Sequence, residues 1–94
     1  MPADLEEKTE QYERMLEAAL SAATVAVPEG TPLGRAAADC VEMADAYLED
    51  GRHFHDDGDP VNALAAYAYG YGWLDAGVRM GLFSIPDECE LFTT

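Results

Sequence analysis

The chain has 94 residues, which suits a single domain over residues 1–94 and is short for two. Its 19 acidic residues against 5 lysines and arginines give a formal net charge of −14, yet 49% of the residues are hydrophobic, so the composition is that of a folded chain and not of a disordered one. The charge disfavours nucleic acid and anionic membranes as partners, because the sequence has no basic stripe that could displace counterions.

The first predicted helix runs from about Leu5 to Ala23. Asp4 can cap its N-terminus, and acidic residues in the first turns suit the positive end of the helix dipole. The residues expected to pack form one stripe: Leu5, Tyr12, Leu16, Ala19 and Ala23. The residues expected to face water are Glu6, Glu10, Glu13 and Glu17.

The second predicted helix spans about residues 32–57, because Thr31 followed by Pro32 is a favourable cap and first helical position. Its expected packing stripe is Leu33, Ala37, Cys40, Ala44, Tyr47 and Phe54, widened by Val41 and Leu48. Gly58 is a C-terminal stop, and Asp59 with Pro60 starts the next helix at once. A connection this short makes the two helices antiparallel neighbours.

The third predicted helix spans about residues 60–80 and is apolar almost all the way round. The set expected to face the core is Val61, Leu64, Tyr67, Tyr71, Val78 and Leu82. The opposite set is Tyr69, Trp73 and Met80, with Ala66 and Ala76. Either the first helix and the tail cover this set, or it is exposed for a partner or a second copy. Glycines 70, 72 and 77 lower helix propensity, and close approach of a neighbouring backbone would compensate for this cost. This helix is therefore expected in the middle of the fold.

The tail, residues 82–94, is expected to be irregular, with Phe83, Ile85, Leu91 and Phe92 able to cover part of the bundle. The predicted fold class is all-α. The predicted architecture is a three-helix antiparallel bundle with a short irregular C-terminal tail.

The corner and the third helix carry a recognisable pattern: Gly58-Asp59, Ala63, Ala66, Tyr69, Gly72, Leu74-Asp75-Ala76 and Gly81. This pattern resembles a small archaeal family catalogued as domain of unknown function 357. The resemblance implies a compact antiparallel helical bundle of archaeal origin, and the family has no established activity to carry over.

The balance of charges favours a halophilic archaeon as the source. Carboxylates are abundant and Lys8 is the only lysine. In molar salt the Debye length falls to about 3 Å, so mutual repulsion is screened and a carboxylate-rich surface stays hydrated. The alternative is a mesophilic protein with an acidic binding surface.

The expected location is the cytoplasm. The N-terminus lacks the basic and apolar regions of a signal peptide. Cys40 and Cys89 stand alone, which suits a reducing compartment. The longest apolar run, from Ala63 to Leu74, is too short to span a bilayer.

One dense cluster of possible metal ligands surrounds the predicted corner: His53, His55, Asp56, Asp57 and Asp59. Zinc and manganese sites are built from such groups. The alternative is that the histidines stabilise the C-terminal end of a helix and the aspartates cap or turn the chain. We expect no bound cofactor.

Asp75 is unusual because helical spacing places it beside core-facing residues. A buried carboxylate needs a partner, and Arg79 follows one turn later. The two readings are a buried structural pair of Asp75 with Arg79 and a ligand-binding or acid–base role for Asp75.

These observations favour a non-enzymatic protein-interaction module or homo-oligomer that uses the third helix, with Tyr69, Trp73 and Met80 as contact residues. The alternative is a small hydrolase, or a metal- or nucleotide-associated enzyme subunit, that uses Asp75 or the corner of His53, His55 and Asp57. The sequence contains no phosphate-binding loop, nucleophile elbow or zinc-protease motif.

Overall fold

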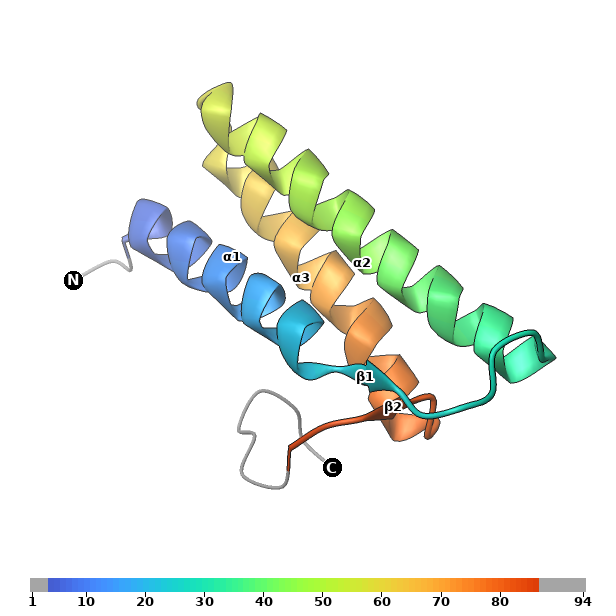
Figure 1. Ribbon diagram of the computed structural model, residues 1–94. Helices are drawn as coiled ribbons and strands as arrows, with labels where there is room; N and C mark the ends of the chain where they lie inside the picture. The colour runs from blue at the N-terminus through green and yellow to red at the C-terminus, as the bar shows by residue number, and fades with distance from the viewer. Residues whose placement is uncertain (1–3, 87–94) are drawn as a thin grey trace.

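A computed structural model describes residues 4–86 and contains three helices and a two-stranded sheet (Figure 1). The elements are α1 (Leu5–Ala22), β1 (Thr24–Val25), α2 (Pro32–Asp56), α3 (Pro60–Arg79) and β2 (Phe83–Ser84). α1 and α3 run in the same direction and α2 runs in the opposite one (Figure 1). The predicted all-α, three-helix bundle is thus confirmed.

The N-terminus of each helix is capped by a side chain that the sequence places there. The Asp4 carboxylate accepts hydrogen bonds from the backbone N–H groups of Glu6 and Glu7. Thr31 accepts one from Gly34, and Asp59 accepts one from Asn62. These caps satisfy backbone donors that have no partner inside the helix, which fixes where each helix begins.

The corner between α2 and α3 is as tight as predicted. Gly58 has a φ of 78°, a backbone conformation that glycine adopts without a steric penalty. The Gly58 N–H donates to His55 O and the Asp59 N–H donates to Phe54 O, which closes the C-terminus of α2. α3 begins at the next residue, Pro60.

α3 occupies the middle of the fold, as its composition predicts. It packs more extensively against α2 than against α1, and α1 and α2 share only a small contact (Figure 1). The Cα atoms extend over 45 × 26 × 16 Å, so the three helices form a thin layer. The most deeply buried large side chains are Leu16, Tyr67 and Leu74, together with Thr9.

Two glycines of α3 are explained by close neighbours. A Cβ atom at Gly70 would lie 2.9 Å from side-chain atoms of both Leu16 and Tyr47, and one at Gly77 would lie 2.3 Å from the Phe83 ring. Only glycine lets these neighbours approach so closely, which offsets its low helix propensity. The neighbours are side chains as well as backbone, and Gly72 has no such neighbour.

The beginning of the tail is more regular than predicted. β2 pairs antiparallel with β1, with Thr24 opposite Ser84 and Val25 opposite Phe83. The Ala26 N–H also donates to Leu82 O at 2.9 Å. This pairing holds the chain after α1 against the chain after α3. Leu91 and Phe92 lie outside the described residues.

At the opposite end of the layer, Thr9 holds α1 against the start of α3. Its hydroxyl donates to Leu5 O at 2.7 Å and lies 3.3 Å from Pro60 O, and its side chain is fully buried.

Among the described residues, no helix combines the length and the apolarity needed to cross a bilayer.

Candidate functional site

The predicted contact residues lie on one partly exposed side of α3. Tyr69 and Met80 are each 65% exposed, and Trp73 is partly buried against the core. Ala76 is exposed one turn after Trp73, on the same side. α3 therefore presents a row of apolar and aromatic side chains that the other described helices do not cover.

Two neighbouring depressions lie along this row. The first has a volume of about 330 Å³ and is lined by Tyr69, Gly72, Trp73 and Ala76. The second has a volume of about 380 Å³ and is lined by Tyr47, Phe54, Asn62, Ala65, Ala66 and Tyr69. Tyr69 lines both, so they form one continuous surface on the two helices. We call this surface, together with Met80, the α2–α3 face.

α2 contributes two aromatic side chains to the α2–α3 face. The ring centroids of Tyr47 and Tyr69 are 5.1 Å apart and the rings are tilted by 37°. Phe54 is 39% exposed, although its position in the stripe predicts a packed residue. Aromatic side chains that remain accessible in this way are characteristic of interaction surfaces.

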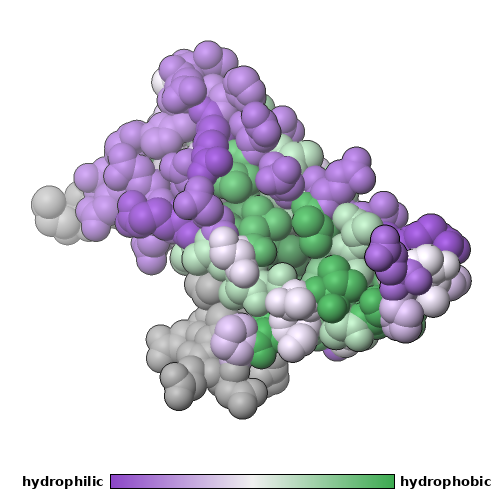
Figure 2. Space-filling view, in the orientation of Figure 1, coloured by the Kyte–Doolittle hydropathy of each residue, from purple (hydrophilic) through white to green (hydrophobic). Residues whose placement is uncertain are grey.

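Hydrophilic and apolar residues separate on the molecular surface. Hydrophilic residues gather over the N-terminal half of α1 and the neighbouring end of α2, whereas apolar residues reach the surface over the middle of the layer (Figure 2). A thin layer leaves much of its central helix accessible, which explains how apolar surface and strong acidity coexist in one small fold.

Asp75 and Arg79 form a surface pair, and the prediction of a buried pair is wrong. Arg79 Nε lies 3.3 Å from Asp75 Oδ2, but the side chains are 56% and 31% exposed, respectively. The buried side of α3 is centred on Ala63, Gly70 and Leu74, which turns Asp75 towards the edge of the helix. A half-exposed pair of this kind contributes little to stability.

The candidate ligands of the corner are not brought together in one group among the described residues, and Asp59 caps α3, as the alternative reading expects. His53 is exposed, and Asp57 is the C-cap that follows α2. Asp59 is engaged as the cap of α3, where it also accepts a hydrogen bond from Asn62 Nδ2 at 2.6 Å. Within residues 4–86, the potential ligands that come together are His55 of α2 with Glu6 and Glu10 of α1.

The contact between His55 and Glu6 joins α2 to α1. His55 Nε2 is paired with a carboxylate oxygen of Glu6. This hydrogen bond is the main cause of a raised pKa at His55, and the charges of Glu13 and Glu10 add to it. The charged imidazolium is therefore stabilised in the folded state.

We expect the free energy of unfolding to fall as pH rises through the pKa of folded His55. A raised folded pKa gives stability that is fully present below the ordinary histidine pKa of about 6.5 and is lost above the folded value. Urea unfolding of the wild type and of His55→Gln between about pH 6 and pH 9 measures this. His53→Gln is the matched control, because it removes the neighbouring exposed histidine and leaves the contact of His55 with Glu6 in place. An unchanged slope in His55→Gln would exclude the contact as its source.

Arg52 makes a second connection between α2 and α1. Its Nε lies 2.6 Å from Glu13 Oε2, and its Nη2 is paired with Glu17. Glu17 is exposed, as predicted, whereas Glu13 is partly buried, and both carboxylates are also paired with Arg52. The reason is that α1 lies alongside α2 closely enough for a long arginine side chain to reach both carboxylates.

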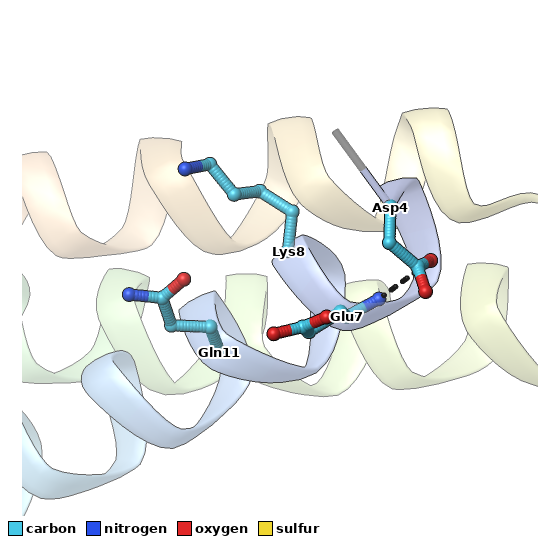
Figure 3. Close-up of a pocket in the computed structure, with 4 residues that line it drawn as sticks. All are labelled: Asp4, Glu7, Lys8 and Gln11. Atoms are coloured by element: carbon cyan, nitrogen blue, oxygen red, sulfur yellow. Dashed lines mark hydrogen bonds between the residues drawn. The ribbon is translucent and has the colours of Figure 1, made fainter. Parts of the chain in front are cut away.

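A third depression, of about 220 Å³, has no features of a reactive site. Its lining residues, Asp4, Glu7, Lys8 and Gln11, all come from the first turns of α1 and its cap, and Asp4 is turned back onto the Glu7 backbone N–H (Figure 3). The carboxylate of Asp4 is thus already used as a helix cap, and the side chains spread from one helix instead of converging on a point.

Comparison with known protein families shows a match. The profile of a family described as "Protein of unknown function (DUF357)" matches residues 11–83, which include all of α2 and α3 and most of α1. No curated protein and no solved structure matches the chain. The matched range contains the whole α2–α3 face as defined above.

Proposed function

The chain belongs to the DUF357 family of proteins of unknown function, and we propose that it is a non-enzymatic protein-interaction module that binds its partner through the α2–α3 face. The observation that carries this proposal is the continuous, accessible surface on which Tyr69 joins two apolar depressions. Tyrosine and tryptophan are enriched among the residues that dominate binding energy at protein interfaces.

The remaining parts of the site give no comparable support to an enzyme. Asp75 is tied to Arg79 at the surface, and the corner aspartates are used in capping and turning the chain. Asp75 and the corner are the two places that an enzymatic reading would use.

The proposal includes the setting in which the module works, which is the cytoplasm of an archaeon that accumulates salt. The support is the net charge of −14 with a single lysine, because a carboxylate-rich surface remains hydrated when salt screens its repulsion. Apolar contacts are not weakened by such screening, so an interface built on aromatic side chains suits this setting.

The test is a pull-down with the tagged chain from archaeal lysate in molar KCl, compared with Tyr69→Glu. A charge at this exposed position should abolish capture of a stoichiometric partner and change the stability of the chain little. Ala68→Glu is the matched control, because Ala68 is the preceding residue, is also exposed, and lines neither depression. Identical capture by both variants would refute the proposal.

Trp73 gives a second measurement in the same experiment. It is the only tryptophan of the chain, so its fluorescence reports directly on the α2–α3 face. Binding of the captured partner should shift the emission of Trp73 to shorter wavelength, because the indole would lose contact with water.

A further inference from the structure

Building on the proposed function, we infer the chemistry of the partner: an amphipathic helix whose apolar stripe is flanked by lysine or arginine. Three features of the α2–α3 face support this, namely its shape, an unfilled position at Gly72, and an acidic strip along α2. The inference depends on the proposed function, since it names the partner of the same face.

The shape of the face fits a helix. The lining residues of α3 run from Asn62 to Ala76, a stretch of about 21 Å at a rise of about 1.5 Å per residue. They lie beside Tyr47 and Phe54 of the antiparallel α2, so the surface follows the line between two packed helices. A third helix packs into such a line through ridges and grooves, as amphipathic helices do in apolar grooves.

Gly72 marks a place where a helix backbone can approach closely. A Cβ atom at Gly51, Gly70 or Gly77 would lie within 3.0 Å of a neighbouring side chain, so packing inside the fold explains those three helical glycines. A Cβ atom at Gly72 would meet nothing within 4 Å among the described residues. Gly72 nevertheless lies in the middle of the face, beside the small Ala76, where a partner helix would gain from the missing side chain.

An acidic strip borders the α2–α3 face on α2. Asp50 lies three residues after Tyr47 and four residues before Phe54, and Asp57 lies three residues after Phe54. Residues three or four positions apart are neighbours on the surface of a helix, so both aspartates lie beside these aromatic side chains. Asp39 continues the strip towards the start of α2, and all three aspartates are exposed. Among residues 4–86, the ion pairs join Arg52, His55 and Arg79 to other carboxylates, and none of them involves the three aspartates.

The same charges argue against a second copy of this chain as the occupant. A symmetric dimer would place the same surface on both partners and bring two acidic strips together in a molecule of net charge −14. Like charges facing each other across an interface oppose binding, whereas lysine and arginine beside an apolar stripe complement the strip at contact distance, where salt screens a partly buried pair much less than an exposed one.

The test is a display selection of random 20-residue peptides on the full-length chain at low salt, with Tyr69→Glu as the counter-selection. We expect enriched peptides to carry apolar residues at helical spacing with lysine or arginine beside them. Replacing those cations by glutamine should weaken binding about threefold to tenfold. The double variant Asp39→Asn/Asp50→Asn should show the same loss, and Glu7→Gln/Glu10→Gln on α1, which removes the same charge elsewhere, should not.

The outcomes separate this inference from the proposed function. Enriched peptides that bind the wild type and the Asp39→Asn/Asp50→Asn variant equally would overturn the basic partner and leave the interaction face intact. Enrichment that is equal on Tyr69→Glu would overturn both. A dimer in sedimentation equilibrium that Tyr69→Glu dissociates would assign the face to a second copy. Peptide binding that appears only in a chain ending at Pro86 would assign the face to residues 87–94. Both the dimer and this result would overturn the inference.

Discussion

Tyr67→Ala is expected to lower the free energy of unfolding by about 3–5 kcal/mol, the range for removal of a buried aromatic ring. Tyr67 is fully buried and is the largest side chain in the core. It lies on the central helix, so the cavity would open where α3 packs against its neighbours. Small domains have total stabilities of about 5–15 kcal/mol, so this single change removes a large part. Urea unfolding at a fixed salt concentration measures this loss of stability, because urea is uncharged and does not change the ionic strength.

The matched control is Tyr67→Phe, which keeps the ring and removes only the hydroxyl. That hydroxyl is buried and has no hydrogen-bond partner among the described residues, and burial raises the pKa of Tyr67 to about 12. Tyr67→Phe should therefore leave stability unchanged or raise it by about 1 kcal/mol. A loss as large as that of Tyr67→Ala would mean that the hydroxyl, and not the ring, stabilises the core.

Gly51→Val is expected to destabilise the chain by about 2–3 kcal/mol through overpacking. A Cβ atom at Gly51 would lie 2.2 Å from Cε1 and 2.5 Å from Cδ1 of the Tyr67 ring. These atoms belong to a ring enclosed on all sides, so neither α2 nor α3 can yield without loss of other contacts. The midpoint of urea unfolding reports the effect.

Gly72→Val is the matched control for Gly51→Val. Both glycines lie inside helices, but Gly72 has open space around it, so the same substitution should change stability by less than about 0.5 kcal/mol. The double variant Gly51→Val/Tyr67→Ala adds a further check, because removing the ring removes the clash. Its loss should be clearly smaller than the sum of the two single losses, and strict additivity would contradict the contact.

The local features of this fold could be predicted from the sequence because short-range chemistry determines them. Asp4, Thr31 and Asp59 each cap a helix through a hydrogen bond to a residue two or three positions later. Gly58 and Gly81 both have positive φ just after the end of a helix, a position at which glycine is favoured. Helix positions and the antiparallel hairpin follow directly from these signals.

The orientation of α3 could not be predicted, because a helix that is apolar all round carries no signal for its buried side. The core-facing set includes Val61, which the structure leaves exposed, and omits Gly70, which it buries. The buried side is chosen by glycines that admit neighbouring side chains, and this choice depends on α1 and α2. The placement of Asp75 was wrong for the same reason.

The contacts between helices could not be predicted from the sequence either. The partners of Arg52 lie 35 and 39 positions earlier in the chain, and His55 meets Glu6 across 49 positions. Helical periodicity places a residue on one side of its own helix, but it does not say which residue of another helix lies opposite. By contrast, the periodicity of α3 itself places Tyr69, Trp73 and Met80 on one side of the helix, although it does not say whether that side is exposed.

From the central position of α3 we expect two levels of cooperativity in the fold. The contact of α3 with α2 is larger than its contact with α1, so α1 can detach at a lower cost than the hairpin can open. We expect the amide hydrogens of α1 to exchange with solvent through this partial opening, and those of α3 to exchange only when the whole chain unfolds. The α2–α3 face belongs wholly to the hairpin. The proposed recognition surface therefore lies on the part of the molecule that we expect to unfold last.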